Sequence, residues 1–186
     1  IRPRDIVTKK SLENAAVVVA ASGGSTNAAL HLPAIANEAG IKFTLEDVTN
    51  ISKKTPYIAD LKPGGKYVAK DLYEIGGVPV LIKALLDGGL LHKDCMTVTG
   101  KTIGENHKNV IFPSNQKIIY KTSKPLSPRG GFAGLKGNLA PEGAIVKVAG
   151  MKRKKFKGKA KCYDGEPSAL NAVLERKIKP GDVIVI

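Results

Sequence analysis

The sequence predicts an α/β protein in which a mainly helical first part is followed by a part built of short strands. In the first part, apolar side chains recur at helical spacing, and the predicted helices are 12–21, 26–39, 45–53 and 78–86. From about residue 110, short apolar or β-branched runs alternate with turn residues. The predicted strands are 117–120, 132–136, 144–148, 155–162 and 182–186, and one further helix is expected at 167–176.

Local signals support the predicted helix ends. The segment 44–47 begins with Thr and ends with Asp, which resembles a capping box at a helix start. Gly40 and the pair Gly88–Gly89 are placed to end their helices, because glycine adopts the left-handed conformation without strain. Pro33 lies inside the second predicted helix, where it removes the hydrogen bond to Ala29 and costs on the order of 3 kcal/mol unless the helix bends. We therefore predict a kink at Pro33.

A polar stretch that contains several prolines separates the two parts. Pro125 and Pro128 lie near its end, and such residues punctuate regular structure. We therefore predict a partial N-terminal α/β domain over 1–109, a linker over 110–128 and a partial C-terminal β-rich domain over 129–186.

The chain is strongly basic, with a formal net charge of +14. A charge of this size is a footprint of nucleic-acid binders, but the pattern favours another explanation. Basic residues alternate with small or apolar ones, as in a strand with a solvated lysine face and a buried face. The basic positions are Arg153, Lys155, Lys157, Lys159 and Lys161, and the others are Phe156, Gly158, Ala160 and Cys162. Because Trp is absent and aromatic platforms are few, we predict no specific nucleic-acid partner.

Membrane and metal partners are also disfavoured. The longest apolar stretch lies around 15–21. A membrane-spanning helix needs roughly 18 or more consecutive apolar residues. We therefore predict no membrane partner. Cys95 and Cys162 are the two cysteines and lack Cys-x-x-Cys spacing. We predict free, buried thiols in a reducing compartment, the cytoplasm or an organelle. Two thiols do not supply the four ligands of a usual iron–sulfur cluster.

The most informative motif is Gly-Gly-Ser-Thr-Asn at 23–27, which we expect to open a helix. The first N–H groups of a helix lack intrahelical partners and favour an anion. Ser25, Thr26 and Asn27 can add donors to a bound carboxylate, or simply cap the helix. His31 shares a helix face with Asn27, so it either lines the same pocket or is a core histidine bonded to a carbonyl. We predict substrate binding at Ser25, Thr26, Asn27 and His31.

Other candidates are weaker. The turn at 137–143 contains Asn138 and Glu142, which are placed to shape a cleft. Lys101 follows Gly100 as in a P-loop, but position 95 is Cys rather than the required glycine, so that motif fails. Asp164 and Glu166 could bind a cation, but two carboxylates at a helix start are more simply explained as capping charges. His31, His92 and His107 lack the paired spacing of zinc ligands.

Several phrases occur together in a characteristic order. They are GGSTN at 23–27, TVTGKT at 97–102 and KGNLAPEGA at 136–144, with PRDI at 3–6, GGVP at 76–79 and GLLH at 89–92 between and before them. Together they resemble the dihydroxy-acid dehydratase family, within the dihydroxy-acid/phosphogluconate dehydratase superfamily, over the whole chain. The phrase GKYV at 65–68 is more similar to the branched-chain enzymes than to the sugar-acid enzymes.

The resemblance implies conversion of a 2,3-dihydroxy-3-methyl acid to a 2-keto acid in valine and isoleucine biosynthesis. It also implies an iron–sulfur cluster and Mg²⁺, a homodimeric parent enzyme, an α/β N-terminal domain and a β-barrel-like C-terminal domain. This chain then holds the later part of the first domain and the opening part of the second. The cysteine and magnesium ligands of the family and its catalytic serine have no counterparts here, so we expect an internal portion with no catalytic or metal-binding residue, inactive by itself.

Two alternatives remain open. A sugar-acid dehydratase, acting on an aldonate or phosphogluconate, shares the GGSTN helix and would differ in substrate preference. A non-enzymatic basic module would bind anionic partners and need neither a cluster nor magnesium.

Overall fold

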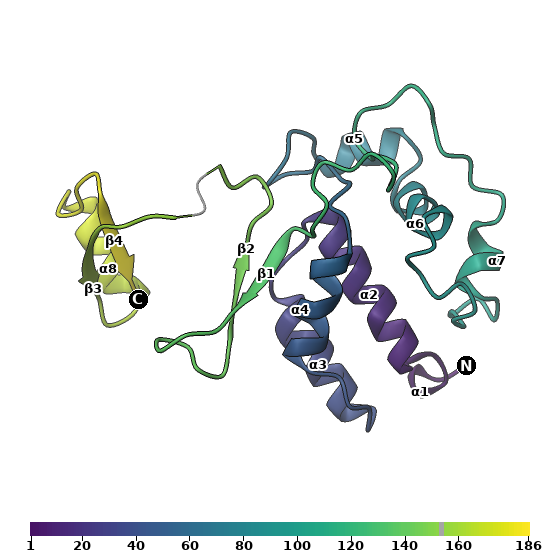
Figure 1. The fold of residues 1–186 in the computed structure, drawn as a ribbon, viewed down its shortest axis with the longest axis horizontal. Helices are drawn as coiled ribbons and strands as arrows, with labels where there is room; N and C mark the ends of the chain where they lie inside the picture. Colours follow the sequence, from purple (N-terminus) through teal and green to yellow (C-terminus); the bar gives the residue numbers. More distant parts are fainter. Residues whose placement is uncertain (153–154) are drawn as a thin grey trace. The chain divides into compact units, whose positions relative to one another are not determined.

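The chain is a mixture of helices and strands, in agreement with the predicted α/β class (Figure 1). The structure, a computed structural model, describes residues 1–152 and 155–186. Contacts divide it into two units, Ile1–Met151 and Lys152–Ile186, and each unit is described by itself. The described residues form two sheets of two strands each and no closed barrel.

The first unit contains all but one of the described helices. They are α1 (Pro3–Ile6), α2 (Lys9–Ser22), α3 (Ala28–Glu38), α4 (Leu45–Lys54), α5 (Ala69–Glu74), α6 (Val78–Asp87) and α7 (Ile103–His107). The predictions at 12–21, 45–53 and 78–86 are therefore confirmed. The helix expected from residue 26 begins two residues later, at Ala28. Pro33 lies inside α3, and the kink there stays a prediction.

Helix α2 lies between two apolar cores because its apolar run is continuous around the helix. Ala16 and Ala20 pack into a core shared with α3 and α4, whereas Val17 and Ala21 pack into a core shared with α6. Both cores contain fully buried side chains, such as Val48 in the first. Each such side chain contributes about 1.5–3 kcal/mol through its removal from water.

The predicted cap of α4 is confirmed. The Thr44 N–H donates to Asp47 Oδ2 over 2.7 Å, and the Asp47 N–H donates to Thr44 Oγ1 over 3.3 Å. These bonds satisfy donors that a helix start otherwise leaves unpaired. Gly40 and Gly89 have positive φ angles of 71° and 66°, as expected of residues that follow a helix.

The first unit ends in an antiparallel hairpin of β1 (Phe132–Leu135) and β2 (Ala144–Lys147), close to the predicted strands. Its register pairs Phe132 with Lys147 and Leu135 with Ala144. The buried Ser52 hydroxyl of α4 donates to the Phe132 carbonyl over 2.6 Å. The hairpin is thereby attached to the helical core.

The strand predicted at 117–120 is wrong. Ile119 forms only an isolated bridge to Ala59. The Gln116 side-chain oxygen accepts from the N–H groups of Ile118 and Ile119, over 2.7 and 2.8 Å, so the local chain turns instead of extending a ladder. Ile118 and Ile119 are nevertheless buried in the core beside α6, so this part of the segment expected as a linker packs on the first unit.

The second unit is a strand–helix–strand arrangement. Strands β3 (Lys159–Cys162) and β4 (Asp182–Val185) pair in parallel, and α8 (Glu166–Leu174) connects them. The connection contains a helix because parallel neighbours cannot be joined by a tight turn. The helix expected at 167–176 is confirmed within two residues, and the strand expected at 155–162 is shorter than predicted.

The predicted alternation of a buried and a solvated face in this strand is wrong. Phe156 is 59% exposed and Cys162 is also exposed, whereas Lys161 is half-buried and its ammonium lies 3.0 Å from the Asp182 carboxylate. Pairing with Asp182 offsets the cost of partly burying a lysine charge. Arg153, the first residue of the predicted pattern, lies outside the described residues.

Candidate functional site

The GGSTN segment forms the connection between α2 and α3, which differs from the predicted helix opening. Gly23 ends α2 in a left-handed conformation, with φ of 61°. Ser25 then caps the turn that leads into α3, because its Oγ accepts from the Asn27 N–H over 3.2 Å. The N–H groups of Ala28 and Ala29 bond to carbonyls at 25 and 26, over 3.2 and 3.0 Å. Few amides of this helix start therefore remain for an anion.

Asn27 and His31 are exposed and one helical turn apart, with the His31 N–H bonded to the Asn27 carbonyl over 2.9 Å. His31 is therefore not a core histidine. Ser25 and Thr26 instead line a pocket of about 520 Å³, which we call the α2–α3 pocket. Its lining residues are Ser22, Gly23, Gly24, Ser25, Thr26, Leu61, Lys62, Pro63 and Lys147.

Backbone contacts between distant segments build this pocket. A Cβ on Gly131 would lie 2.5 Å from the Cα of Gly23, so only glycine allows this approach. The Gly131 N–H donates to the Ala20 carbonyl over 2.8 Å, and the Gly131 carbonyl accepts from Val148 and Ala149, over 2.8 and 2.9 Å. The end of α2 is thus fixed against the end of the hairpin that carries Lys147.

A second set of contacts brings Lys62 to the same pocket. The N–H groups of Ile58 and Ala59 both donate to the carbonyl of Ala21, in the last turn of α2, over 2.9 and 3.2 Å. The loop that follows closes on itself, since the Lys62 N–H donates to the Tyr67 carbonyl over 2.7 Å. Lys62 and Lys147 therefore face one pocket although they are far apart in sequence.

Tyr57 lies directly behind the pocket wall. A Cβ on Gly23 would come within 2.8 Å of its ring, and the side chain is 7% exposed. Its buried hydroxyl has no hydrogen-bond partner among the described residues, and buried polar groups of this kind are uncommon. Burial, and then the nearby charge of Asp60, raise the pKa of Tyr57 above its ordinary value. The phenol is therefore a neutral group beside the pocket at physiological pH.

The comparisons with known proteins extend over the whole chain. Residues 1–106 match the model of the dihydroxy-acid/6-phosphogluconate dehydratase N-terminal domain, and residues 117–186 match that of the C-terminal domain. The chain belongs to this dehydratase family. Membership in this family explains why motifs such as GGSTN at 23–27 and KGNLAPEGA at 136–144 occur in this order.

The curated relatives support the same family assignment. Dihydroxy-acid dehydratase of Pelagibacter ubique is 67% identical over 186 residues, and dihydroxy-acid dehydratase 2 of Bradyrhizobium diazoefficiens is 65% identical over 186 residues. Dihydroxy-acid dehydratase of Saccharolobus islandicus is 52% identical over 188 residues. Each match covers 100% of this chain, but only 32%, 32% and 34% of the respective relative. The chain thus spans about a third of the length of these dehydratases.

Asn138 and Glu142 lie away from the α2–α3 pocket. Asn138 is exposed in the loop between β1 and β2. Glu142 lines a different pocket of about 530 Å³, against Glu46 and Lys53 of α4. The structure therefore brings Ser25 and Thr26 together with two lysines that the sequence did not indicate, and it places Asn138 elsewhere.

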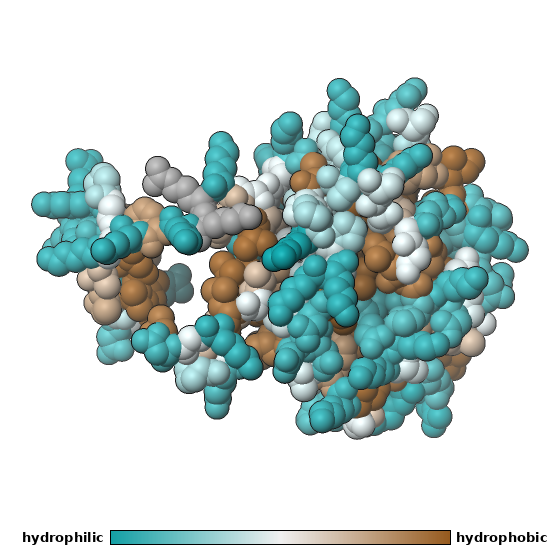
Figure 2. All heavy atoms as spheres, viewed as in Figure 1, coloured by the Kyte–Doolittle hydropathy of each residue, from teal (hydrophilic) through white to brown (hydrophobic). Residues whose placement is uncertain are grey.

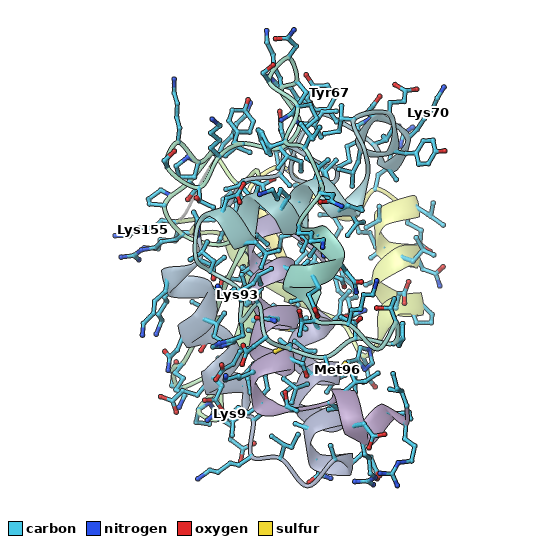
Figure 3. The ribbon with its side chains drawn as sticks, turned by 90° about the vertical axis from the view of Figure 1, so that its right-hand side faces the viewer. Lys9, Tyr67, Lys70, Lys93, Met96 and Lys155 are labelled. Carbon is cyan, nitrogen blue, oxygen red and sulfur yellow. The ribbon has the colours of Figure 1, made fainter. Side chains whose placement is uncertain are left out.

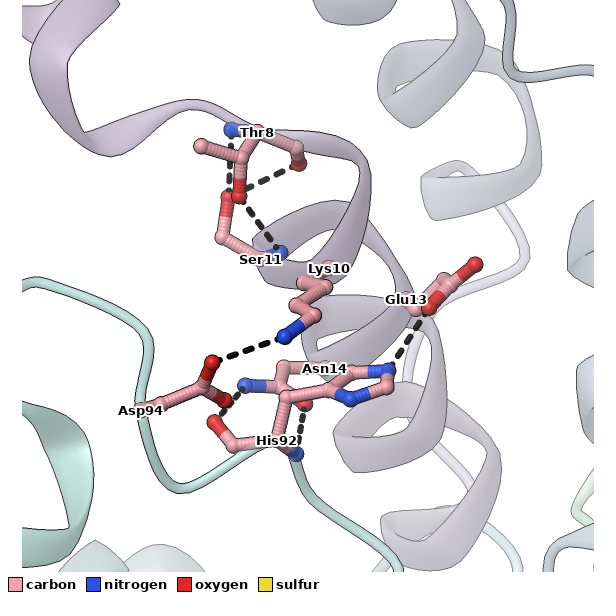
Figure 4. Close-up of polar contacts among 7 residues, drawn as sticks. All are labelled: Thr8, Lys10, Ser11, Glu13, Asn14, His92 and Asp94. Atoms are coloured by element: carbon pink, nitrogen blue, oxygen red, sulfur yellow. Dashed lines mark hydrogen bonds and ion pairs between the residues drawn. The ribbon is translucent and has the colours of Figure 1, made fainter.

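His92 is part of a polar cluster with side chains from the first half of α2 (Figure 4). His92 Nε2 lies 2.7 Å from the Glu13 carboxylate, and the buried Asn14 bonds both backbone groups of His92, over 2.8 and 3.0 Å. Lys10 forms an ion pair with Asp94 over 2.7 Å. These bonds attach the loop after α6 to α2 and give the cluster a structural role.

The described residues contain no preformed site for the cluster or Mg²⁺ that the family resemblance implies. Over residues 1–152 and 155–186, no group of three or more His, Cys, Asp or Glu side chains converges. Cys95 is half-buried in the first unit, where burial raises the pKa of its thiol, and Cys162 is exposed in the second unit. The expectation that Cys162 is buried is wrong. The described part of the chain therefore holds no converging set of ligands for either cofactor.

The surface of the dehydratase chain is hydrophilic over much of its area. Figure 2 shows hydrophilic side chains spread over the visible face of the first unit, with apolar residues between them. In Figure 3 the side chains of Lys9, Lys70 and Lys93 are labelled on different parts of this unit. Among the described residues, no helix is both long and apolar enough to cross a bilayer.

Proposed function

We propose that this chain forms part of a dihydroxy-acid dehydratase of valine and isoleucine biosynthesis. The reaction breaks the C2–H and C3–OH bonds of 2,3-dihydroxyisovalerate, releases water and gives an enol that becomes the 2-keto acid. The observation that carries this proposal is the identity of 67% with a relative named dihydroxy-acid dehydratase over all 186 residues.

The role proposed for the chain is to form part of the substrate-binding wall. Ser25 and Thr26 line the α2–α3 pocket, and a pocket of about 520 Å³ is large enough for a small acid. Asn27, His31 and Asn138 do not line this pocket in the described residues, and we propose them as substrate contacts outside it. We propose no catalytic group within the chain.

We propose that the iron–sulfur cluster and Mg²⁺ of the enzyme are bound by residues outside this chain, because no group of three or more candidate ligands converges in the described residues. When bound, a cluster iron or Mg²⁺ supplies a Lewis acid for the departing hydroxyl. We further propose that residues 1–109 are part of the N-terminal α/β domain, 110–128 its linker and 129–186 the opening of a β-barrel-like domain. The proposed enzyme is a homodimer without a nucleic-acid or membrane partner.

A segment exchange tests the function. The 186-residue chain replaces the matching segment of the Pelagibacter ubique dehydratase, to which it aligns at 67% identity. We expect the chimeric enzyme to form 2-keto acid from 2,3-dihydroxyisovalerate in preference to gluconate or 6-phosphogluconate. The control is a chimera that carries Ser25→Ala and Thr26→Val, in which we expect a higher KM.

The outcomes separate the candidate functions. Preference for a sugar acid would overturn the branched-chain assignment in favour of the sugar-acid alternative. A folded chimera that binds its cofactors but is inactive on every acid would refute the enzymatic role. The chain alone, after anaerobic treatment with iron and sulfide, is expected to show neither cluster absorbance nor turnover.

A further inference from the structure

The charge of the α2–α3 pocket differs from that of the other large pockets in the described residues. Two lysines and no carboxylate line it. Each of four other pockets includes at least one acidic side chain, namely Glu38, Glu46 with Glu142, Asp87, and Asp5 with Asp94. A pocket with uncompensated positive charge favours an anionic ligand.

The two lysines have no carboxylate partners of their own. Neither Lys62 nor Lys147 forms an ion pair with any residue in 1–152 or 155–186, whereas Lys10 and Lys83 each contact an aspartate, over 2.7 and 2.6 Å. Lys147 is also half-buried, at the end of β2. Lys62 is exposed. A lysine ammonium without a carboxylate neighbour among these residues can form a charge-assisted hydrogen bond with a bound anion.

Neutral donors complete the same pocket. Ser25 Oγ accepts from the Asn27 N–H, which leaves its own O–H free to donate. The Thr26 hydroxyl has no partner among the described residues. Ser22, by contrast, donates its hydroxyl to the Val19 carbonyl over 3.3 Å. Two residues with hydroxyl groups and two lysines therefore line one pocket, a combination suited to an acid that also carries hydroxyl groups.

The walls of this pocket are fixed rather than formed by a single mobile loop. The backbone bonds of Gly131 join the end of α2 to the end of β2, and those of Ala21 join α2 to the segment before Lys62. The orphaned Tyr57 hydroxyl beside Gly23 is a further sign that polar groups here lack their full set of partners. Fixed walls reduce the ordering cost of binding.

We propose that Lys62 and Lys147 together bind the carboxylate group of the substrate in the α2–α3 pocket, while Ser25 and Thr26 contact its hydroxyl groups. The assignment of that substrate as a dihydroxy acid rests on the proposed function. The lysines are substrate-binding residues and take no part in bond breaking. The net charge of +14 also steers anions toward the chain, but only the pocket places two charges on one ligand.

Lysine footprinting of the 186-residue chain tests the proposal without requiring activity. Reductive methylation is followed at each lysine by mass spectrometry, with and without 2-hydroxyisovalerate, a carboxylate that lacks the leaving C3 hydroxyl. We expect methylation of Lys62 and Lys147 to slow several-fold. Lys70 and Lys93, labelled in Figure 3 and exposed, serve as reference lysines and should not change. The neutral methyl ester of the same acid should protect none of the four.

Equal rates at Lys62 and Lys147 with and without the acid would overturn the proposal. Uniform protection of all four lysines would overturn it as well, because it would indicate a diffuse ion atmosphere. In the chimeric enzyme, the double change Lys62→Gln and Lys147→Gln should raise KM for 2,3-dihydroxyisovalerate roughly tenfold or more with little change in kcat. The matched double change Lys70→Gln and Lys93→Gln should leave KM unaltered.

The two experiments distinguish the two proposals. An inactive chimera with carboxylate-specific protection would refute the dehydratase function and retain the lysine site. An active chimera whose KM does not respond to the Lys62 and Lys147 changes would retain the function and refute the lysine site.

Discussion

Substitution of Gly131 by alanine is the sharpest test of how the α2–α3 pocket is built. The new Cβ would lie 2.5 Å from the Cα of Gly23 and 3.2 Å from the Cβ of Ala149. The nearest atom belongs to the backbone, so rotation of a side chain cannot relieve the contact. Separation to an ordinary distance of about 3.5–4.0 Å requires the two segments to move apart by roughly 1 Å or more.

That movement weakens bonds that hold the pocket together. The Gly131 N–H bonds to Ala20 and its carbonyl accepts from residues 148 and 149. Overpacking of this kind costs about 1–3 kcal/mol. For a chain of this size, each kcal/mol lowers Tm by about 2–4 °C, so we expect a Tm lower by roughly 2–12 °C in thermal unfolding of the purified chain. In the chimeric enzyme, we also expect a higher KM.

Gly137→Ala is the matched control, because a Cβ there meets nothing within 4 Å. Neither glycine has a positive φ, so backbone preference does not distinguish them. We expect this control to change the free energy of unfolding by no more than about 0.5 kcal/mol. Equal Tm values for Gly131→Ala and Gly137→Ala would refute the close approach between the end of α2 and the hairpin.

Three further predictions concern other parts of the chain. Asn14→Ala should lower the free energy of unfolding by about 1–3 kcal/mol in urea titrations, since it leaves both backbone groups of His92 without their partner. Hydrogen bonds from the cap of α4 hold the pKa of Asp47 below its ordinary value, so its stabilisation is full above about pH 4 and is lost as pH falls through the lower folded pKa. The destabilisation by Asp47→Asn should therefore be largest near neutral pH and shrink in acid. Iodoacetamide should label the exposed Cys162 before the half-buried Cys95, whose raised pKa lowers its thiolate fraction.

Each of these predictions has a contrary result. A stability loss no greater for Asn14→Ala than for an exposed Asn50→Ala change would contradict the structural role of the cluster in Figure 4. A destabilisation by Asp47→Asn that is independent of pH would rule out the proposed titration. Faster labelling of Cys95 than of Cys162, followed by peptide mass spectrometry, would contradict the observed exposures.

The helices of the first unit could be predicted from sequence because their signals are local. Apolar spacing identifies α4 and α6, and the Thr44 and Asp47 side chains lie three residues apart at a helix start. The prediction of a strand at 117–120 was wrong for a reason that is also local but has no clear sequence signal. The Gln116 side chain accepts hydrogen bonds from the N–H groups of Ile118 and Ile119, which a strand would use to pair with a neighbour.

The buried face predicted for the strand near Lys161 failed because periodicity alone does not reveal charge pairing. Alternation fixes which residues share a face, but not which face is covered. The ion pair with Asp182 comes from a strand that is paired through tertiary structure. Lys161 is therefore more buried than its neighbours Ala160 and Cys162.

The sequence by itself determined the family, through phrases such as residues 23–27, and the class of each long helix, because both depend on local order along the chain. Only the tertiary structure decided the composition of the candidate site. Lys62 and Lys147 carry no sequence signal that separates them from the other lysines of a strongly basic chain. They share a pocket because backbone bonds and the close approach at Gly131 bring three distant segments together. Contacts between residues far apart in sequence depend on packing, which local patterns do not encode.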